Sequence, residues 1–295
     1  SPRLFPLGSS VPAQQYLAKE KSLVQGRGSA RSQKIGERDS RKMTQKLTFN
    51  VHTAQKKPNN QDSCPFCQID SLEKIIAQKG DMIWLDNKYP VLAKTYQTLI
   101  IESSQHLGDI TTYSKAHNRK LFAFALKAWR QLEDSGRFKT VGLFKNFGPL
   151  SGGSLRHPHM QVIGFEGVDA YEAIDAETFA GALVSQERTD LARVTISAQP
   201  LSSFTEINVV IADQRDSDKL ADTVQKVLRY VLEGYLGGAC SSYNLFFYHQ
   251  GEGLVCKVIP RFVASPYMIG YHLVQVNSDS RVAEEVAELQ AFLEN

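Results

Sequence analysis

Two histidines and a glutamine alternate at the end of the segment 151–161, which reads SGGSLRHPHMQ. An apolar run follows at 162–165, so the pattern predicts a loop rich in glycine and serine that leads into a strand. Because side chains alternate between the two faces of a strand, His157, His159 and Gln161 would share one face. Neutral imidazole can attack phosphorus, and backbone N–H groups of the loop could bind an anion. The segment therefore predicts a site that reacts with phosphates. The alternative is that the three residues are ordinary polar residues on the solvent-exposed face of a strand.

Two cysteines separated by two residues form a second motif, Cys64-Pro65-Phe66-Cys67. Such a pair is half of a tetrahedral zinc site, and the other ligands must come from distant parts of the chain. The alternatives are an incidental pair or a redox pair, although no βαβ pattern follows the motif. Cys240 and Cys256 lie in apolar surroundings and are expected to be small buried side chains of the core.

The elements around these motifs are predicted to occur in the same order twice. The first set has strands at 82–85, 98–102, 141–147 and 157–165, with an amphipathic helix over 114–134. The second set, offset by about a hundred residues, has strands at 193–198, 206–212, 242–248 and 254–262, with a helix over 217–236. Further helices are predicted over 71–79, 171–185 and 281–293. The repeat predicts an α+β fold built from two copies of one unit, of which only the first carries the histidine pair.

The composition excludes several classes of protein. The chain has 295 residues, of which 42% are hydrophobic, and a formal net charge of +3. That charge is too small to indicate a nucleic-acid partner, and no apolar run is as long as a membrane span. Residues 1–42 are rich in Ser, Gly, Arg, Lys and Gln, so we expect a disordered leader or extension, with Met43 as a plausible natural start. The protein is expected to be cytoplasmic.

The glycine- and serine-containing loop followed by His157-Pro158-His159-x-Gln161 resembles the active-site motif of the galactose-1-phosphate uridylyltransferase family, a branch of the histidine-triad superfamily. The resemblance extends from about Met43 to the end of the chain. It implies two histidine-triad-like halves, a catalytic, zinc-binding half at 43–185 and a non-catalytic half at 186–295, each with an antiparallel sheet and one long helix.

The resemblance also implies how the chemistry is divided. A structural zinc ion would be held by four ligands: Cys64, Cys67, His106 and His157. His159 would then be the nucleophile that forms a nucleotidyl-histidine intermediate, and the Gln161 amide would donate to a phosphoryl oxygen as charge builds there.

Substrate-binding residues follow from the same resemblance. Asn146 and Ser154 would contact phosphate, beside the backbone N–H groups of Gly152 and Gly153. Asn87 lies in the turn 86–90, which is similar to the family's nucleoside-binding turn, although Lys88 stands where the family usually has an acidic residue.

Near the end of the chain, Tyr267 and Tyr271 lie in a segment similar to the family's sugar-phosphate segment. Pro266 and His272 replace a lysine and a glutamate of that segment. Lys257, with Val255, stands where some members have the histidines of a second metal site. These departures leave specificity for galactose, and a place in galactose metabolism, open.

These features predict a nucleotidyltransferase resembling the hexose-1-phosphate uridylyltransferases. It would move a nucleoside monophosphate from a nucleotide sugar or related nucleotide to a phosphate acceptor. Nucleotide hydrolases of the superfamily have a third histidine at position 161, and an amide cannot protonate a leaving group as a histidine can, so Gln161 favours transfer over hydrolysis. Two alternatives stay open: a phosphorylase of nucleotide sugars or dinucleoside polyphosphates, and a nucleotide-binding module without turnover. A homodimer is implied by the resemblance alone.

Overall fold

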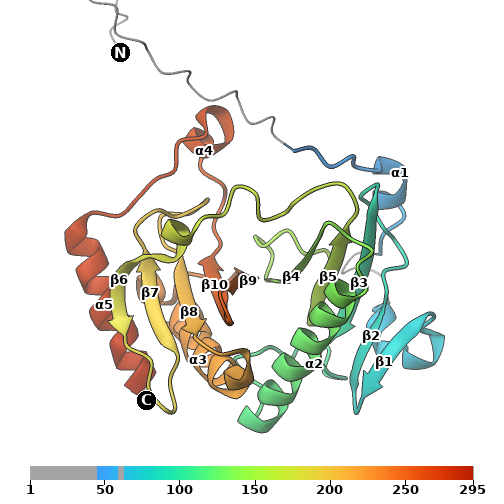
Figure 1. The fold of residues 1–295 in the computed structure, drawn as a ribbon, viewed down its shortest axis with the longest axis horizontal. Coiled ribbons are helices and arrows are strands. Elements are labelled where there is room, and N and C mark those ends of the chain that lie inside the picture. The colour runs from blue at the N-terminus through green and yellow to red at the C-terminus, as the bar shows by residue number, and fades with distance from the viewer. Residues whose placement is uncertain (1–44, 59–62, 295) are drawn as a thin grey trace, which may run out of the picture. The chain divides into compact units, whose positions relative to one another are not determined.

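The computed structural model of the chain describes residues 45–58 and 63–294. The predicted leader at 1–42 lies outside these residues. Ten strands form one sheet in the order β1-β2-β3-β5-β4-β9-β10-β8-β7-β6 (Figure 1). All neighbouring strands are antiparallel. The strands are β1 (Ile75–Lys79), β2 (Met82–Asp86), β3 (Thr95–Ile101), β4 (Thr140–Phe147), β5 (His159–Phe165), β6 (Gly181–Ser185), β7 (Arg193–Ser197), β8 (Ile207–Ile211), β9 (Tyr243–Gln250) and β10 (Gly253–Pro260).

The strand order is the same when read from either edge of the sheet toward its centre. One half runs β1-β2-β3-β5-β4 and the other runs β6-β7-β8-β10-β9. The halves meet where β4 pairs with β9, with Asn146 opposite Asn244. The predicted α+β fold of two similar halves, each with an antiparallel sheet and one long helix, is therefore confirmed, and the two halves share one continuous sheet.

Three longer helices contribute to one apolar core against this sheet: α2 (Lys115–Asp134), α3 (Ser217–Arg229) and α5 (Asp279–Glu294). Figure 1 shows α2 and α3 each crossing its own half, with α5 beside β6. Ser114 begins α2, because its side chain accepts a hydrogen bond from the His117 N–H. Trp129 of α2 is fully buried and donates its indole N–H to the Val141 carbonyl at 2.9 Å, which fixes the helix on β4.

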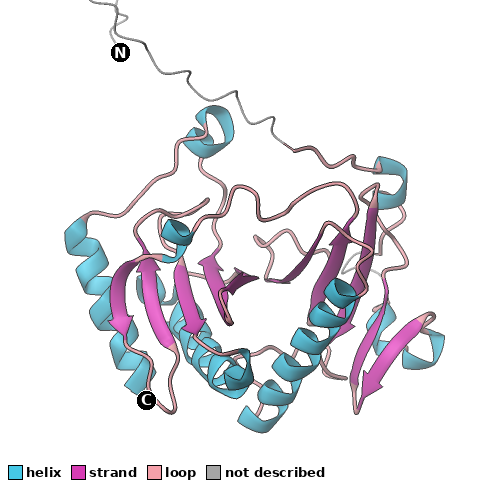
Figure 2. Cartoon of the chain, viewed as in Figure 1, coloured by secondary structure: helices cyan, strands magenta, loops and turns pink. Residues whose placement is uncertain are grey.

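The remaining helical segments are short (Figure 2). They are α1 (Val51–Ala54) and α4 (Pro266–Tyr271), the 3₁₀ turns η2 (Pro65–Cys67), η3 (Ile69–Ser71), η4 (Ala176–Phe179), η5 (Gln214–Asp216) and η7 (Tyr235–Gly238), and the π turn η6 (Tyr230–Gly234). No helix among the described residues is long and apolar enough to cross a membrane.

Two predicted helices are wrong. Most of the range 71–79 is the edge strand β1, and the range 171–185 holds η4 and the opposite edge strand β6. An edge strand pairs on one side only, and in β1 the exposed positions include Ile75 and Ile76, so the alternation of apolar and polar residues expected of a half-buried strand is weak. The β-branched pair Ile75 and Ile76 favours a strand once β2 supplies a partner.

The sheet has a second face, and the predicted chemistry lies there. His159 pairs with Ile101 and Gln161 pairs with Leu99, so these four side chains point away from α2. Leu99 and Ile101 form a small apolar cluster with Phe66 of the Cys64–Cys67 motif. This cluster forms part of the floor of the candidate site.

Candidate active site and metal centre

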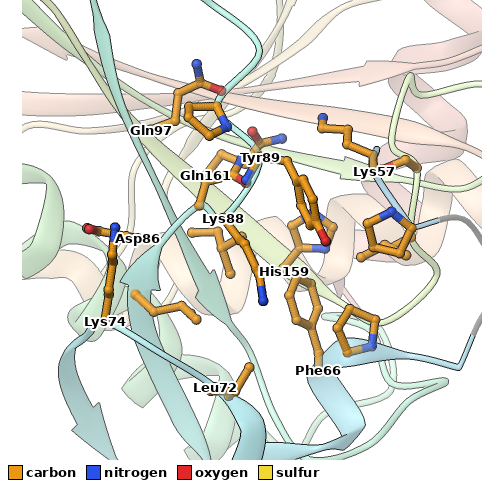
Figure 3. A pocket seen from close by; sticks show the side chains of 18 of the residues that line it. Lys57, Phe66, Leu72, Lys74, Asp86, Lys88, Tyr89, Gln97, His159 and Gln161 are labelled. Atoms are coloured by element: carbon orange, nitrogen blue, oxygen red, sulfur yellow. The ribbon is translucent and has the colours of Figure 1, made fainter. Parts of the chain in front are cut away.

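A pocket of about 560 Å³ opens on this second face (Figure 3). Its walls come from several parts of the chain: strands β2 and β3, the cysteine motif, the turn 87–90, the loop 152–155, and the segments 57–58 and 71–74. His159 and Gln161 of β5 both line it. The volume lies in the range of pockets that hold small ligands. The two side chains predicted to do chemistry therefore lie in a cavity large enough for a nucleotide.

His157 does not share this wall. It precedes β5, is fully buried and turns toward the cysteine motif. Its Nδ1 lies 3.6 Å from the Cys64 sulfur and 3.4 Å from the Cys67 sulfur, and the Cys67 sulfur lies 3.4 Å from Nδ1 of His106. Tetrahedral zinc with Zn–S of about 2.3 Å and Zn–N of about 2.05 Å places S and N ligand atoms about 3.6 Å apart. The four residues predicted as ligands thus form one cluster with the spacing of a closed tetrahedral metal site.

The hydrogen bond on the far side of His157 fits the same role. Its Nε2 lies 2.9 Å from the Ser103 carbonyl oxygen, which can only accept, so Nε2 carries the hydrogen and Nδ1 keeps its lone pair. Metal-bound histidines usually donate their second ring N–H in this way. Desolvation raises the pKa of the Cys67 thiol, and the neighbouring Cys64 raises it further, so a bound cation would be needed to hold the Cys67 sulfur as a thiolate.

His159 is held by an equivalent bond but with its second nitrogen free. Its Nδ1 donates to the His157 carbonyl oxygen at 2.9 Å, so the lone pair is on Nε2. Phe66 packs edge-on against the ring with centroids 5.4 Å apart. Burial lowers the pKa of His159 to about 4, against the raising effect of the His157 carbonyl. Neutral imidazole, the nucleophilic form, therefore predominates at neutral pH.

The glycine-serine loop is held by a hydrogen bond from Asn244 on the neighbouring strand β9. Asn244 donates to the Asn146 side-chain oxygen at 2.6 Å and to the Ser151 carbonyl at 3.0 Å. Gly152 has a φ of +84°, a conformation that glycine adopts readily, and with Gly153 and Ser154 it lines the pocket. Asn146, predicted to contact phosphate, is not among the pocket-lining residues, and its side-chain oxygen accepts the hydrogen bond from Asn244.

The other predicted substrate residues are divided between two places. Asn87 lines the pocket, and its side-chain oxygen accepts from the Tyr89 N–H at 2.9 Å. Tyr267 and Tyr271 of α4 are 55% and 74% exposed and do not line the pocket. Figure 2 shows α4 on a connection that leaves the sheet.

Sequence reasoning missed several residues of the pocket. Phe66 stands between the two cysteines and has no role that the sequence indicates, yet it packs on His159. Lys57 lines the pocket, and its charge helps to lower the pKa of His159. Leu72, in the segment between η3 and β1, and Tyr96 of β3 carry no sequence signal, because only the folding of distant segments brings them to the pocket.

The sequence matches two family models, which are described as the N-terminal and C-terminal domains of a domain of unknown function (DUF4931), at residues 49–168 and 171–291. A crystal structure of a DUF4931 family protein from Bacillus cereus ATCC 10987 is similar, with 40% identity and a TM-score of 0.68, covering 75% of this chain and 100% of that chain. No curated protein matches significantly.

Two further solved structures share the fold at low identity. A uridylyltransferase has 17% identity and a TM-score of 0.60, covering 81% of this chain and 93% of that chain. An ADP-glucose phosphorylase from Arabidopsis thaliana, solved with bound ADP-glucose, has 14% identity and a TM-score of 0.61, with the same coverage. The predicted resemblance is therefore confirmed for the fold.

Proposed function

Because this chain belongs to the DUF4931 family and has the fold of uridylyltransferase-like proteins of the histidine-triad superfamily, we propose that it is a nucleotidyltransferase. It would move a nucleoside monophosphate from a nucleotide sugar or related nucleotide to a phosphate acceptor. The observation that carries this proposal is His159, whose Nε2 lone pair is free in the pocket while its Nδ1 is held by the His157 carbonyl.

The proposed reaction has two steps. Nε2 of His159 attacks the α-phosphorus, a P–N bond forms, and the bond from phosphorus to the bridging oxygen breaks, so that the first product leaves as a phosphate. A phosphate oxygen of the acceptor then attacks the same phosphorus and the P–N bond breaks. The Gln161 amide and the backbone N–H groups of Gly152, Gly153 and Ser154 would donate to the non-bridging oxygens, where charge builds in both steps.

Zinc is the metal that we propose for the Cys64, Cys67, His106 and His157 cluster, because two sulfurs and two imidazoles in tetrahedral spacing suit it. With four protein ligands the ion would be structural and would supply a clamp between the cysteine motif and the start of β5. Free thiols that serve as ligands fit a reducing compartment, so the cytoplasmic location remains part of the proposal.

The identity of the acceptor separates two forms of this function. The relatives in fold include a uridylyltransferase and an ADP-glucose phosphorylase. Inorganic phosphate as acceptor would make the protein a phosphorylase, and a sugar phosphate would make it a transferase of the hexose-1-phosphate uridylyltransferase type. Gln161 is compatible with both, since either acceptor and either leaving group is a phosphate.

The exposed apolar residues of α4 in the second half would be explained by a homodimer. Tyr267, Ile269 and Tyr271 are 55%, 68% and 74% exposed on α4. Apolar side chains gathered at this exposure are typical of an interaction surface. We propose that α4 packs on a second copy and brings Tyr267 and Tyr271 to the sugar-phosphate side of that copy's pocket.

The test is capture of the covalent intermediate. Protein incubated with a uridine or adenine nucleotide sugar, without acceptor, should gain a nucleoside monophosphate on His159, detected by mass spectrometry of peptides. His159→Asn should lose the adduct and turnover but keep its metal, while His52→Asn, which changes an exposed histidine outside the pocket, should keep all three. An adduct on another residue, or full turnover in His159→Asn, would overturn the proposal.

A further inference from the structure

The walls of the pocket carry more positive than negative charge. Three lysines line it, Lys57, Lys74 and Lys88, against two acidic residues. One of the acids, Asp86, already accepts a hydrogen bond from the Tyr96 hydroxyl. Among the residues that the structure describes, none of the three ammonium groups forms an ion pair with a carboxylate. The pocket is therefore suited to an anionic ligand.

The turn that carries Lys88 is anchored to the sheet on both sides. The Asn87 N–H donates to the Gln97 carbonyl at 2.8 Å, and the Asn87 side-chain oxygen accepts from the Tyr89 N–H at 2.9 Å. Beyond the turn, the Val91 N–H donates to the Gln97 side-chain oxygen at 3.3 Å. Gln97 belongs to β3 and is only 4% exposed, so it is a fixed support. The backbone that positions the Lys88 side chain is therefore held in place.

Lys88 is directed toward the histidine that we propose as the nucleophile. Figure 3 shows its side chain leaving the turn and running toward His159, and both residues line the same pocket. Lys74 runs instead toward Asp86 (Figure 3). A lysine side chain is a flexible stem that ends in a compact charge with three donors. Lys88 is therefore placed to follow the oxygens of a phosphate that binds in front of His159.

The other donors that the proposed reaction places around this phosphate are neutral. They are the Gln161 amide and the backbone N–H groups of Gly152, Gly153 and Ser154. Negative charge builds on the leaving phosphate as its bond to phosphorus breaks, and Gln161 cannot protonate it. A hydrogen bond from a charged donor is roughly twice as strong as one from a neutral donor. A cation placed where charge develops stabilises the transition state more than the bound substrate.

We infer that Lys88 is a further catalytic residue, which contacts the phosphate oxygens that gain charge as His159 attacks. The ammonium group keeps its proton and only donates hydrogen bonds, while the electron pair of the broken P–O bond stays on the leaving phosphate. In the second step the same group faces the acceptor phosphate. The catalytic role rests on the proposed function, whereas the phosphate contact itself requires only that a nucleotide binds in the pocket.

The rate of adduct formation on His159 in a single turnover tests the catalytic role. At a saturating concentration of a uridine or adenine nucleotide sugar, Lys88→Met should lower this rate by about 10- to 150-fold, the effect of losing one hydrogen bond to a charged group. Lys88→Arg should recover part of the loss, because arginine keeps the charge but cannot give up a proton. Lys88 is exposed, so both variants should keep the melting temperature. A rate in Lys88→Arg as low as in Lys88→Met, or an unchanged rate in Lys88→Met, would contradict the inference.

Two other exposed lysines serve as matched controls. Lys74→Met removes a charge from the same pocket, but one that runs toward Asp86, and should lower the rate by less than about 5-fold, the scale for exposed charges in water. Lys79→Met changes a lysine of β1 outside the pocket and should leave the rate unchanged. Equal losses in Lys74→Met and Lys88→Met would mean that both lysines act only through the general field of the pocket, and would refute the contact.

Isothermal titration calorimetry reads the phosphate contact without turnover. The probes are uridine and uridine 5′-monophosphate, with the adenosine pair in parallel. The 5′-phosphate should tighten binding, and Lys88→Met should reduce this gain by a smaller factor than it reduces the rate, because the contact strengthens in the transition state. Equal factors would make Lys88 a ground-state binding residue and overturn its catalytic role. A gain that depends on Lys88, without an adduct in the unaltered protein, upholds the contact and removes the transfer reaction. No binding of any probe removes both.

Discussion

Replacement of Lys145 by methionine should test how a buried charge is held next to the candidate active site. The Lys145 ammonium group is fully buried, bonds the buried Glu102 carboxylate and lies 3.8 Å from the Asp109 carboxylate. Tyr113 donates to Glu102. Burial raises the pKa of Glu102, and the Lys145 charge opposes that shift. Lys145→Met would keep much of the volume and leave two buried carboxylates without their cation.

Breaking a buried pair by removing one partner typically costs about 3–5 kcal/mol. For a unit of this size each kcal/mol lowers the melting temperature by about 2–4 °C, so the expected drop is about 6–20 °C. Without Lys145 the folded-state pKa of Glu102 would rise further above its unfolded value. A group of that kind contributes stability below its unfolded pKa and loses it as pH rises, so the deficit should be larger at pH 8 than at pH 5.

Urea unfolding at both pH values, with metal content measured alongside, would give these free energies. Adding Glu102→Gln to Lys145→Met should recover part of the loss at pH 8, because the orphan charge is removed. Arg119→Met is the matched control: it breaks the partly exposed ion pair with Asp222 and should cost less than about 1 kcal/mol. A loss below about 1 kcal/mol for Lys145→Met, equal at both pH values, would contradict the reasoning.

Three further outcomes are expected. Cys64→Ser should lower the zinc content from about one per chain and reduce stability, because the closed four-ligand site loses a sulfur; an unchanged zinc content on metal analysis would remove Cys64 from the site. Gln161→Ala should slow adduct formation by about 10²–10³, the effect of deleting one preorganised donor, with a smaller change in nucleotide binding; an equal change in rate and binding would assign Gln161 to ground-state binding. The rate of adduct formation on His159 should stay near its maximum down to about pH 5 and fall only as pH drops toward 4, because the lowered pKa keeps the imidazole neutral. A metal cation at His157 would lower the pKa of His159 further. A midpoint near pH 6.5 in protein that retains its metal would contradict the buried environment assigned to His159.

The sequence by itself determined the features that depend on local geometry. Apolar residues at helical spacing predict a helix over 114–134, and the helix forms at Lys115–Asp134 with Ser114 as its cap. The shared face of His159 and Gln161 follows from the two-residue period of a strand. The repeat of the two halves was visible because each half repeats the same periodic pattern.

Tertiary structure decided everything that depends on strand register and on contacts between distant segments. The edge strands β1 and β6 form only because a neighbouring strand supplies hydrogen-bond partners, which no local pattern records. Ser103 orients His157 from 54 positions away, and Phe66 packs on His159 because the cysteine motif docks on the open face of the sheet. Lys88 enters the pocket because Gln97 holds its turn. A one-dimensional pattern gives the period of each element, whereas pairing register is set by burial across the whole sheet.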